Sequence, residues 1–214
     1  MKFIKIQYPD GEFEMMDAPV TQIEWQKVMG DNPSYFKGKN NPVEMVSFED
    51  VQNYIKKLNS MHKKYVHRLP TEQEWEFAAK SCDRQDINAI SWNYENSQLK
   101  THPVKKKLPN KLRFYDMLGN VWEWTSSLYF NDGPYRAFRG GSWGNVPQYL
   151  RSACRADAGP GDRSVYVGFR LVRTKISLDS VTLSPLSNPK TREAKVEGIL
   201  KKIEELSKEV KELI

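Results

Sequence analysis

The sequence is poor in the residues on which several common classes of protein depend. Its 214 residues include two cysteines, Cys82 and Cys154, and three histidines. Two thiols cannot form a disulfide scaffold or a four-thiolate zinc site. His62 and His67 are five positions apart and do not share one face of a helix, so the pattern does not favour a non-haem iron or zinc site.

Long apolar runs are also absent. No apolar stretch approaches the roughly 20 residues that a membrane-spanning helix needs. Residues 1–7 lack the apolar core and the cleavage site of a signal peptide. We therefore expect no membrane partner and a cytoplasmic or phage-associated protein.

The charge of the chain is mildly positive, at +6 from 33 Lys and Arg against 27 Asp and Glu. The whole excess lies in residues 1–175, where Lys105, Lys106 and Lys107 form the densest cluster. No nucleic-acid-binding motif accompanies these lysines, so we interpret them as a solvated loop and expect no nucleic-acid partner.

Local patterns predict a mixed α+β domain over residues 1–175. Alternating apolar residues predict a strand at 3–8, followed by a turn and a second strand at 13–15. Thr21, Ser47 and Thr71 each stand before a first helical turn that carries a glutamate or an aspartate, which predicts three helix starts.

The region after residue 80 shows little helical periodicity and many turn-forming residues. A long irregular stretch inside a domain is usually functional or held by contacts other than strand pairing. Four of the six tryptophans lie there and could anchor its core: Trp92, Trp122, Trp124 and Trp143. We expect a closing strand over 167–172.

The C-terminal residues differ in composition from this domain. Residues 176–191 are rich in Ser, Pro and Thr, as in a linker, and 192–214 predict an amphipathic helix. Its apolar residues are spaced alternately by three and four: Val196, Ile199, Ile203, Leu206, Val210 and Leu213. This seam is typical of a parallel dimer, although a trimer, a partner helix or packing against the domain stay open.

The segment from Tyr115 to Trp124 combines two carboxylates, an asparagine and a glycine turn within a few residues. Asp116 and Glu123 supply charge there, and Gly119 can turn backbone carbonyls toward them. Calcium takes oxygen ligands of this mixed kind. By itself, such a pattern is more often a turn with acidic residues at the surface.

Five segments together resemble the formylglycine-generating-enzyme, or sulfatase-modifying-factor, family. They occur in the family's order at 41–48, 68–78, 115–124, 139–143 and 168–170. The resemblance implies a C-type-lectin-like fold with little regular secondary structure. It also implies a structural calcium ion bound by the side chains of Asp116 and Glu123 and by the carbonyls of Gly119 and Val121.

The chain departs from the active members of this family where their copper-binding cysteine pair would stand. Asn145 and Leu150 lie near these positions, and Cys154 matches no catalytic cysteine. Without two thiolates there is no soft site for Cu(I). Iron-dependent relatives need a histidine set and an extra domain, which this chain lacks, so we expect neither copper nor iron and no enzymatic activity.

The segment from Gly140 to Arg170 has an unusual composition, since it contains no Lys, Glu or Met. The residue types at its expected solvent-facing positions can all be reached from an asparagine codon by changing its two adenines. The segment thereby resembles the variable region of diversity-generating-retroelement proteins, in which adenine-directed mutagenesis randomises a binding face. With Trp143 at its edge, the candidate ligand-binding set is Trp143, Gly144, Asn145, Val146, Tyr149, Cys154, Ala156, Ala158, Asp162, Ser164, Val165 and Tyr166.

These patterns favour a non-catalytic, receptor-like protein that binds an unidentified protein or other ligand at the surface of residues 144–166. Short side chains and tyrosines suit such a surface, because they lose little rotamer entropy on binding. Assembly or a partner helix would use 196–214. The alternatives are a metal-dependent oxidase or sulfur-transfer enzyme of the same family, and a regulatory scaffold with an inert 144–166 surface.

Overall fold

A computed structural model describes residues 1–9 and 11–176 of the chain. The predicted linker, apart from its first residue, and the predicted helix at 192–214 lie outside the described residues. The elements in chain order are β1 (Phe3–Tyr8), β2 (Gly11–Met16), α1 (Gln22–Met29), α2 (Phe48–Met61), β3 (Tyr65–Arg68), α3 (Glu72–Ala79), a 3-10 helix η1 (Lys80–Arg84), α4 (Ile87–Ile90), β4 (Trp122–Leu128), β5 (Arg136–Arg139), a 3-10 helix η2 (Pro147–Tyr149), β6 (Arg155–Ala158), β7 (Val167–Gly168) and β8 (Val172–Lys175).

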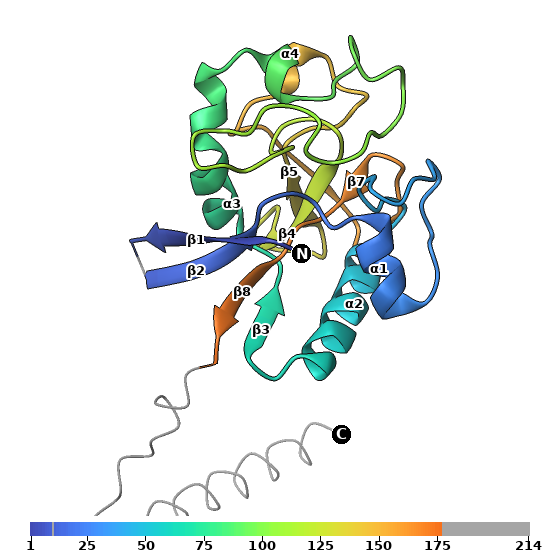
Figure 1. Ribbon diagram of the computed structural model, residues 1–214, viewed down its shortest axis with the longest axis vertical. Helices are drawn as coiled ribbons and strands as arrows, with labels where there is room; N and C mark the ends of the chain where they lie inside the picture. The colour runs from blue at the N-terminus through green and yellow to red at the C-terminus, as the bar shows by residue number, and fades with distance from the viewer. Residues whose placement is uncertain (10, 177–214) are drawn as a thin grey trace, which may run out of the picture. The chain divides into compact units, whose positions relative to one another are not determined.

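The first sheet joins the two ends of the domain. Its strand order is β1-β2-β8-β3, and every neighbouring pair is antiparallel. Met15 of β2 pairs with Val172 of β8, which in turn pairs with Arg68 of β3. Figure 1 shows these strands below the loop-rich part of the domain.

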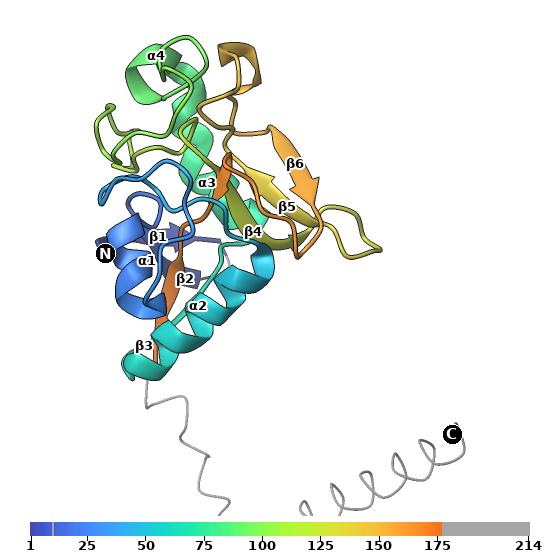
Figure 2. The ribbon, with the colours of Figure 1, turned by 90° about the vertical axis from the view of Figure 1, so that its right-hand side faces the viewer.

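The second sheet carries the segment of unusual composition. Its strand order is β6-β5-β4-β7, with β6 at one edge and the short β7 parallel to β4 at the other. Figure 2 shows β6 and β5 on the side of the domain that lies away from α1. Residues 144–166 therefore surround this sheet and do not form a separate lobe.

The three predicted helix starts are confirmed. Ser47 caps α2 by accepting the Asp50 amide at 3.1 Å, and the Asp50 carboxylate accepts the Ser47 amide at 2.9 Å. Thr71 and Glu74 form the same reciprocal pair at α3. At α1 the capping box of Thr21 and Glu24 is present as well, and the Glu24 carboxylate accepts the Thr21 amide at 2.9 Å and its hydroxyl at 2.8 Å.

The expected closing strand at 167–172 is wrong in one respect, because the structure divides it between the two sheets. Val167 and Gly168 pair with β4, whereas Val172 begins β8 in the first sheet. The residues between them, Phe169 to Leu171, are buried. A mainly apolar run, interrupted here by Arg170, does not show where a chain leaves one sheet for another.

Side-chain amides hold the irregular region from Ser91 to Val121. The Asn110 amide donates to the Ala78 carbonyl at 2.7 Å, and its Oδ1 accepts two backbone amides. The side chain of Asn120 both donates to and accepts from the backbone of His102. The prediction that the region after residue 80 is held by something other than strand pairing is thus confirmed for residues 91–121. It is wrong for residues 122–168, which contain the paired strands of the second sheet.

Two apolar clusters form the interior of the domain. In the first, α1 and α2 pack together, with Trp25 stacked on Tyr54 at 5.1 Å between ring centroids. In the second, α3 and the irregular region pack around Trp75. Of the four tryptophans expected to anchor the irregular region, Trp124 and Trp143 are buried, and Trp92 and Trp122 are partly buried. Among residues 1–9 and 11–176, no helix is long and apolar enough to span a membrane.

Candidate functional site

A pocket of about 260 Å³ opens beside the β4–β5–β6 sheet and collects half of the predicted ligand-binding positions. The predicted residues that line it are Gly144, Asn145, Ala158, Asp162, Ser164 and Tyr166. They come from three stretches within residues 144–166, and the sequence alone could not predict which of these stretches lie together. The pocket therefore brings together positions separated by more than twenty residues.

The remaining predicted positions do not line this pocket. Val146 and Tyr149 are exposed at η2, and Tyr149 is 60% exposed. Cys154, Ala156 and Val165 are partly buried, and Ala156 packs against the first apolar cluster. Trp143 is buried, and its indole nitrogen donates to the Val165 carbonyl at 3.2 Å. Trp143 thus supports the surface and contributes little area to it.

Aromatic rings complete the pocket, and sequence reasoning missed most of them. Trp122, Trp124 and Phe138 line it in addition to Tyr166, and the Trp122 and Phe138 rings meet edge to face at 5.4 Å. The sequence predicts Trp122 and Trp124 only as anchors of the core, and it makes no prediction for Phe138. Ser142 and Val167 are the other lining residues that were missed.

Tyr166 owes its position to the residues beside it. Its ring stacks on Trp143, with 4.6 Å between centroids and 30° between planes. A Cβ atom at Gly144 would lie 2.7 Å from the Tyr166 ring, so any larger residue there moves this tyrosine. A change at 144 would therefore reshape the pocket without touching its other walls.

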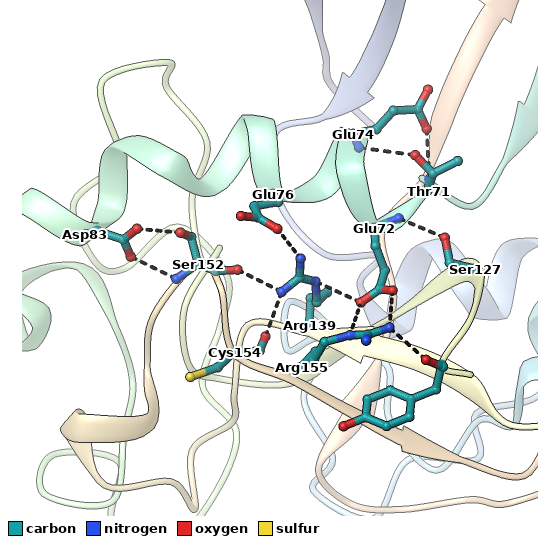
Figure 3. A network of polar contacts seen from close by, with 11 residues as sticks. Thr71, Glu72, Glu74, Glu76, Asp83, Ser127, Arg139, Ser152, Cys154 and Arg155 are labelled. Atoms are coloured by element: carbon teal, nitrogen blue, oxygen red, sulfur yellow. Dashed lines mark hydrogen bonds and ion pairs between the residues drawn. The ribbon is translucent and has the colours of Figure 1, made fainter. Parts of the chain in front are cut away.

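A network of arginines and carboxylates holds the backbone that leads to this surface (Figure 3). Arg139 donates to the carbonyls of Ser152 and Cys154 at 3.1 and 3.2 Å, and it pairs with Glu72 and Glu76 of α3. Asp83 accepts hydrogen bonds from the amide and the hydroxyl of Ser152. We call Arg139, Glu72, Glu76, Asp83 and Arg155 the anchoring network.

Arg155 joins β6 to the same network. Its Nε and one terminal nitrogen donate to the two oxygens of Glu72 at 2.9 and 2.6 Å. Its guanidinium also lies over the ring of Tyr129, 4.3 Å from the centroid. The single carboxylate of Glu72 therefore binds two arginines, one before the 144–166 face and one within it.

Asn145 and Leu150 have structural roles at the positions where the resemblance would place cysteines. Asn145 Oδ1 accepts the Ser142 amide and hydroxyl, each at 2.9 Å, and its carbonyl accepts the Tyr94 amide. Leu150 is buried in the second apolar cluster. Neither side chain offers a thiolate, which is the ligand that Cu(I) prefers.

The predicted calcium ligands do not form a donor set that fits the ion. Both oxygens of Glu123 are taken by Arg170, at 2.6 and 2.7 Å, and one also accepts the indole N–H of Trp75. Asp116 is buried, its Oδ2 accepts the Lys105 amide, and burial raises the pKa of this carboxyl to about 6. Calcium needs six to eight oxygens around it. The Arg170 guanidinium already neutralises the Glu123 carboxylate. Calcium at Asp116, Gly119, Val121 and Glu123 stays a prediction, against which this geometry argues.

A second buried carboxyl lies behind the pocket. Glu44 is fully buried, its Oε1 accepts the Phe36 amide at 2.8 Å, and its Oε2 has no partner among the described residues. Burial raises the pKa of Glu44 to about 7. Phe36 meets Trp143 edge to face at 5.4 Å, so Glu44 supports the loop that packs behind the Trp143–Tyr166 stack. No sequence signal distinguished this glutamate from its neighbours.

Residues 7–175 match the family described as "Sulfatase-modifying factor enzyme 1-like domain". The chain belongs to this family. The chaperone protein LppX of Paenibacillus barcinonensis is 30% identical over 66% of this chain and 75% of that protein. The inactive C-alpha-formylglycine-generating enzyme 2 of Bos taurus is 28% identical over 71% of this chain, and the match spans about half of that relative, 56%.

Among solved structures, Treponema denticola variable protein 1 is similar to this chain, with a TM-score of 0.67 and 27% identity. The similarity covers 80% of this chain and 92% of that one. The predicted family and the C-type-lectin-like α+β fold with little regular secondary structure are thereby confirmed. The likeness to a variable protein also agrees with the second resemblance.

Proposed function

We propose that this chain is a non-catalytic binding protein whose ligand contacts the 144–166 face, and that this face is diversified by a retroelement. The observation that carries the proposal is how the face is held. Its backbone is bound from outside the window, by Arg139 at Ser152 and Cys154 and by Asp83 at Ser152. Side chains such as Val146 and Tyr149 can then change without removing any of these bonds.

Two similar proteins support this proposal. One relative is named an inactive enzyme, and one protein of similar structure is named a variable protein, which agrees with a non-catalytic chain whose binding face varies. In this chain Asn145 and Leu150 stand near the expected cysteine positions and pack as structural residues. No specific contact of the described residues favours the oxidase or the sulfur-transfer alternative.

The DNA beside the gene tests the diversification directly. We expect an adenine-rich near-copy of the codons for residues 140–170 and a reverse-transcriptase gene nearby. Adenines in that copy should fall at the codons for the exposed positions and not at those for Trp143 or Arg155. If neither element is present, diversification is excluded, and a fixed ligand at the same face becomes the simpler function.

Two matched libraries of the full chain test whether the face tolerates change. The first varies Val146, Tyr149, Ser164 and Tyr166, and the second varies Arg139, Ser152, Arg155 and Glu72. We expect most members of the first library to resist proteolysis and most members of the second to lose that resistance. Equal losses in the two libraries would contradict a face that is free to vary.

We also propose that the apolar seam at 196–214 assembles copies of the chain or binds a partner helix. A charge in the middle of the seam should disrupt either arrangement. Sedimentation of the full chain and of Ile203→Asp tests self-association: the wild type should sediment as an oligomer and the variant as a monomer. A wild-type monomer would exclude self-association and leave a partner helix or packing against the domain.

A further inference from the structure

We propose that the pocket beside β6 binds an alkylated ammonium group, such as the head group of choline or the side chain of trimethyl-lysine. This inference rests on the proposed function, because it assigns a ligand chemistry to the 144–166 face. It is carried by the walls of the pocket, by a carboxylate at its rim and by the hydrogen bonds that its polar residues have already made.

The walls are unusually aromatic for so small a space. Four of the eleven lining residues carry aromatic rings: Trp122, Trp124, Phe138 and Tyr166. The face of an aromatic ring attracts cations, and rings grouped into a cage are a common way to bind quaternary ammonium groups. Tyr166 is 41% exposed, so it lies where an entering group first meets the pocket.

Among the described residues that line the pocket, Asp162 is the only one that carries a charge at neutral pH. One of its oxygens accepts the Gly159 amide at 2.8 Å, and among the described residues Asp162 forms no ion pair. The adjacent Arg163 is held by Asp50, with its nitrogens 2.7 and 2.9 Å from the two carboxylate oxygens. The pocket therefore offers a negative charge without a cation to neutralise it.

The other polar residues are not arranged to bind a sugar or an anion. Asn145 Oδ1 accepts from Ser142, and the Ser142 hydroxyl also accepts the Gly144 amide. The Ser164 hydroxyl accepts the Tyr166 amide at 3.2 Å. A sugar needs several free hydrogen-bonding groups, and the Asn145 Oδ1 and both serine hydroxyl oxygens already have partners within the protein. An anion needs a positive charge, and no lysine or arginine among the described residues lines the pocket.

The size of the pocket agrees with a head group and not with a whole ligand. Its volume of about 260 Å³ lies just below the usual range for small-molecule sites, roughly 300 to 1,000 Å³. A compact cation with methyl groups would fit into it, make contact with its rings and leave the rest of its molecule at the exposed face.

Calorimetry with the full chain tests the proposal against a neutral shape control. Choline and 3,3-dimethylbutan-1-ol have the same shape and differ in charge, so a difference between their affinities reports electrostatic attraction. We expect choline to bind about tenfold more tightly, as cation–π and carboxylate attraction together imply. Equal affinities, or no binding of choline, would overturn the proposal.

Two pairs of variants locate the effect. Asp162→Asn keeps an oxygen for the Gly159 amide and removes the charge, and we expect it to weaken choline binding about fivefold. Its control is Asp157→Asn in the neighbouring strand, which should bind as the wild type does. Tyr166→Phe should retain binding and Tyr166→Leu should lose most of it. An Asp162→Asn affinity equal to that of Asp157→Asn would place the cation elsewhere.

Further arms distinguish the sources of the ammonium group and separate this proposal from the proposed function. Phosphocholine and a short peptide with trimethyl-lysine should show which source binds more tightly, each against its unmethylated counterpart. Stronger binding of both unmethylated forms would exclude the alkylated group. Loss of every ammonium probe, together with the expected adenine-rich copy, would overturn the pocket ligand and leave the variable face standing.

Discussion

Two parts of this domain handle charge in opposite ways, the interior around Arg170 and the face of residues 144–166. Arg170 is fully buried, and it donates to both oxygens of Glu123 and to the carbonyls of Met16 and Tyr115. On the face, Asp162 has no cation as partner among the described residues, and Tyr149 is 60% exposed. Around Arg170 the polar groups of the interior hold irregular chain in place, whereas the face leaves groups free for a ligand.

The largest effect should come from breaking the buried pair. Arg170→Met leaves the Glu123 carboxylate buried without its cation, so we expect a loss of about 3–5 kcal/mol in the free energy of unfolding. Urea unfolding measures it. The matched control is Arg163→Met, whose pair with Asp50 lies at the surface and should contribute about 0.2–1 kcal/mol.

If Arg170→Met does not fold, the double variant Arg170→Met with Glu123→Leu keeps the comparison open. Replacing both charges with apolar groups removes the unpaired carboxylate and should recover much of the stability. Equal losses at Arg170 and Arg163 would show that burial does not separate the two regions.

The anchoring network should come second. Glu72→Gln removes the charge that binds both Arg139 and Arg155, and we expect a loss of about 1–3 kcal/mol because two guanidinium groups lose an ionic acceptor. Glu76→Gln is the control on the same helix, since the Glu76 side chain is 44% exposed and pairs with Arg139 alone. A larger loss for Glu76→Gln would contradict the central role of Glu72.

The sequence predicted well what local rules determine. Helix caps at Ser47 and Thr71, the paired strands at the N-terminus and the unusual window from 140 to 170 depend on nearby residues or on composition. It could not predict that Trp122 and Phe138 line a pocket, because burial in a core and burial at the floor of a pocket produce the same alternation. Likewise, the sequence around Glu123 is the same whether a metal ion or an arginine binds this carboxylate, and its partner Arg170 lies 47 positions away.

The third effect is a dependence of stability on pH through Glu44. Its pKa is about 7 in the fold and near the ordinary glutamate value of about 4.3 in the unfolded chain. Between these values the unfolded chain has released the proton that the folded chain keeps, so Glu44 makes the fold less stable as pH rises from about 4.5 to 7. Glu44→Gln removes this contribution.

Urea unfolding at several pH values checks the difference between the wild type and Glu44→Gln. Taking this difference removes the contributions of other titrating groups to the pH dependence of stability. One such group is His67, whose pKa is lowered by burial to about 4. We expect the wild type to lose stability relative to the variant across this interval and the two curves to run parallel above pH 7. Parallel curves at every pH would mean that Glu44 is ionised in the fold.

The fourth effect should be close to zero. Val146→Ser and Tyr149→Ser change two exposed residues of the face. Among the described residues, neither side chain forms a hydrogen bond. We expect each to shift the free energy of unfolding by less than about 0.5 kcal/mol. Their control is Gly144→Ser, whose Cβ would displace the Tyr166 ring and should cost more. A large loss at Tyr149 would assign that residue to the interior.

The smallest expected effect is that of calcium on thermal unfolding. A ligand that binds only the folded state raises the melting temperature as its concentration exceeds the dissociation constant. Because Arg170 takes both oxygens of Glu123, we expect no shift with calcium or with a chelator. A rise with calcium that Asp116→Asn abolishes would contradict this expectation, and it would show that the ion can displace Arg170 and that the interior also holds a ligand.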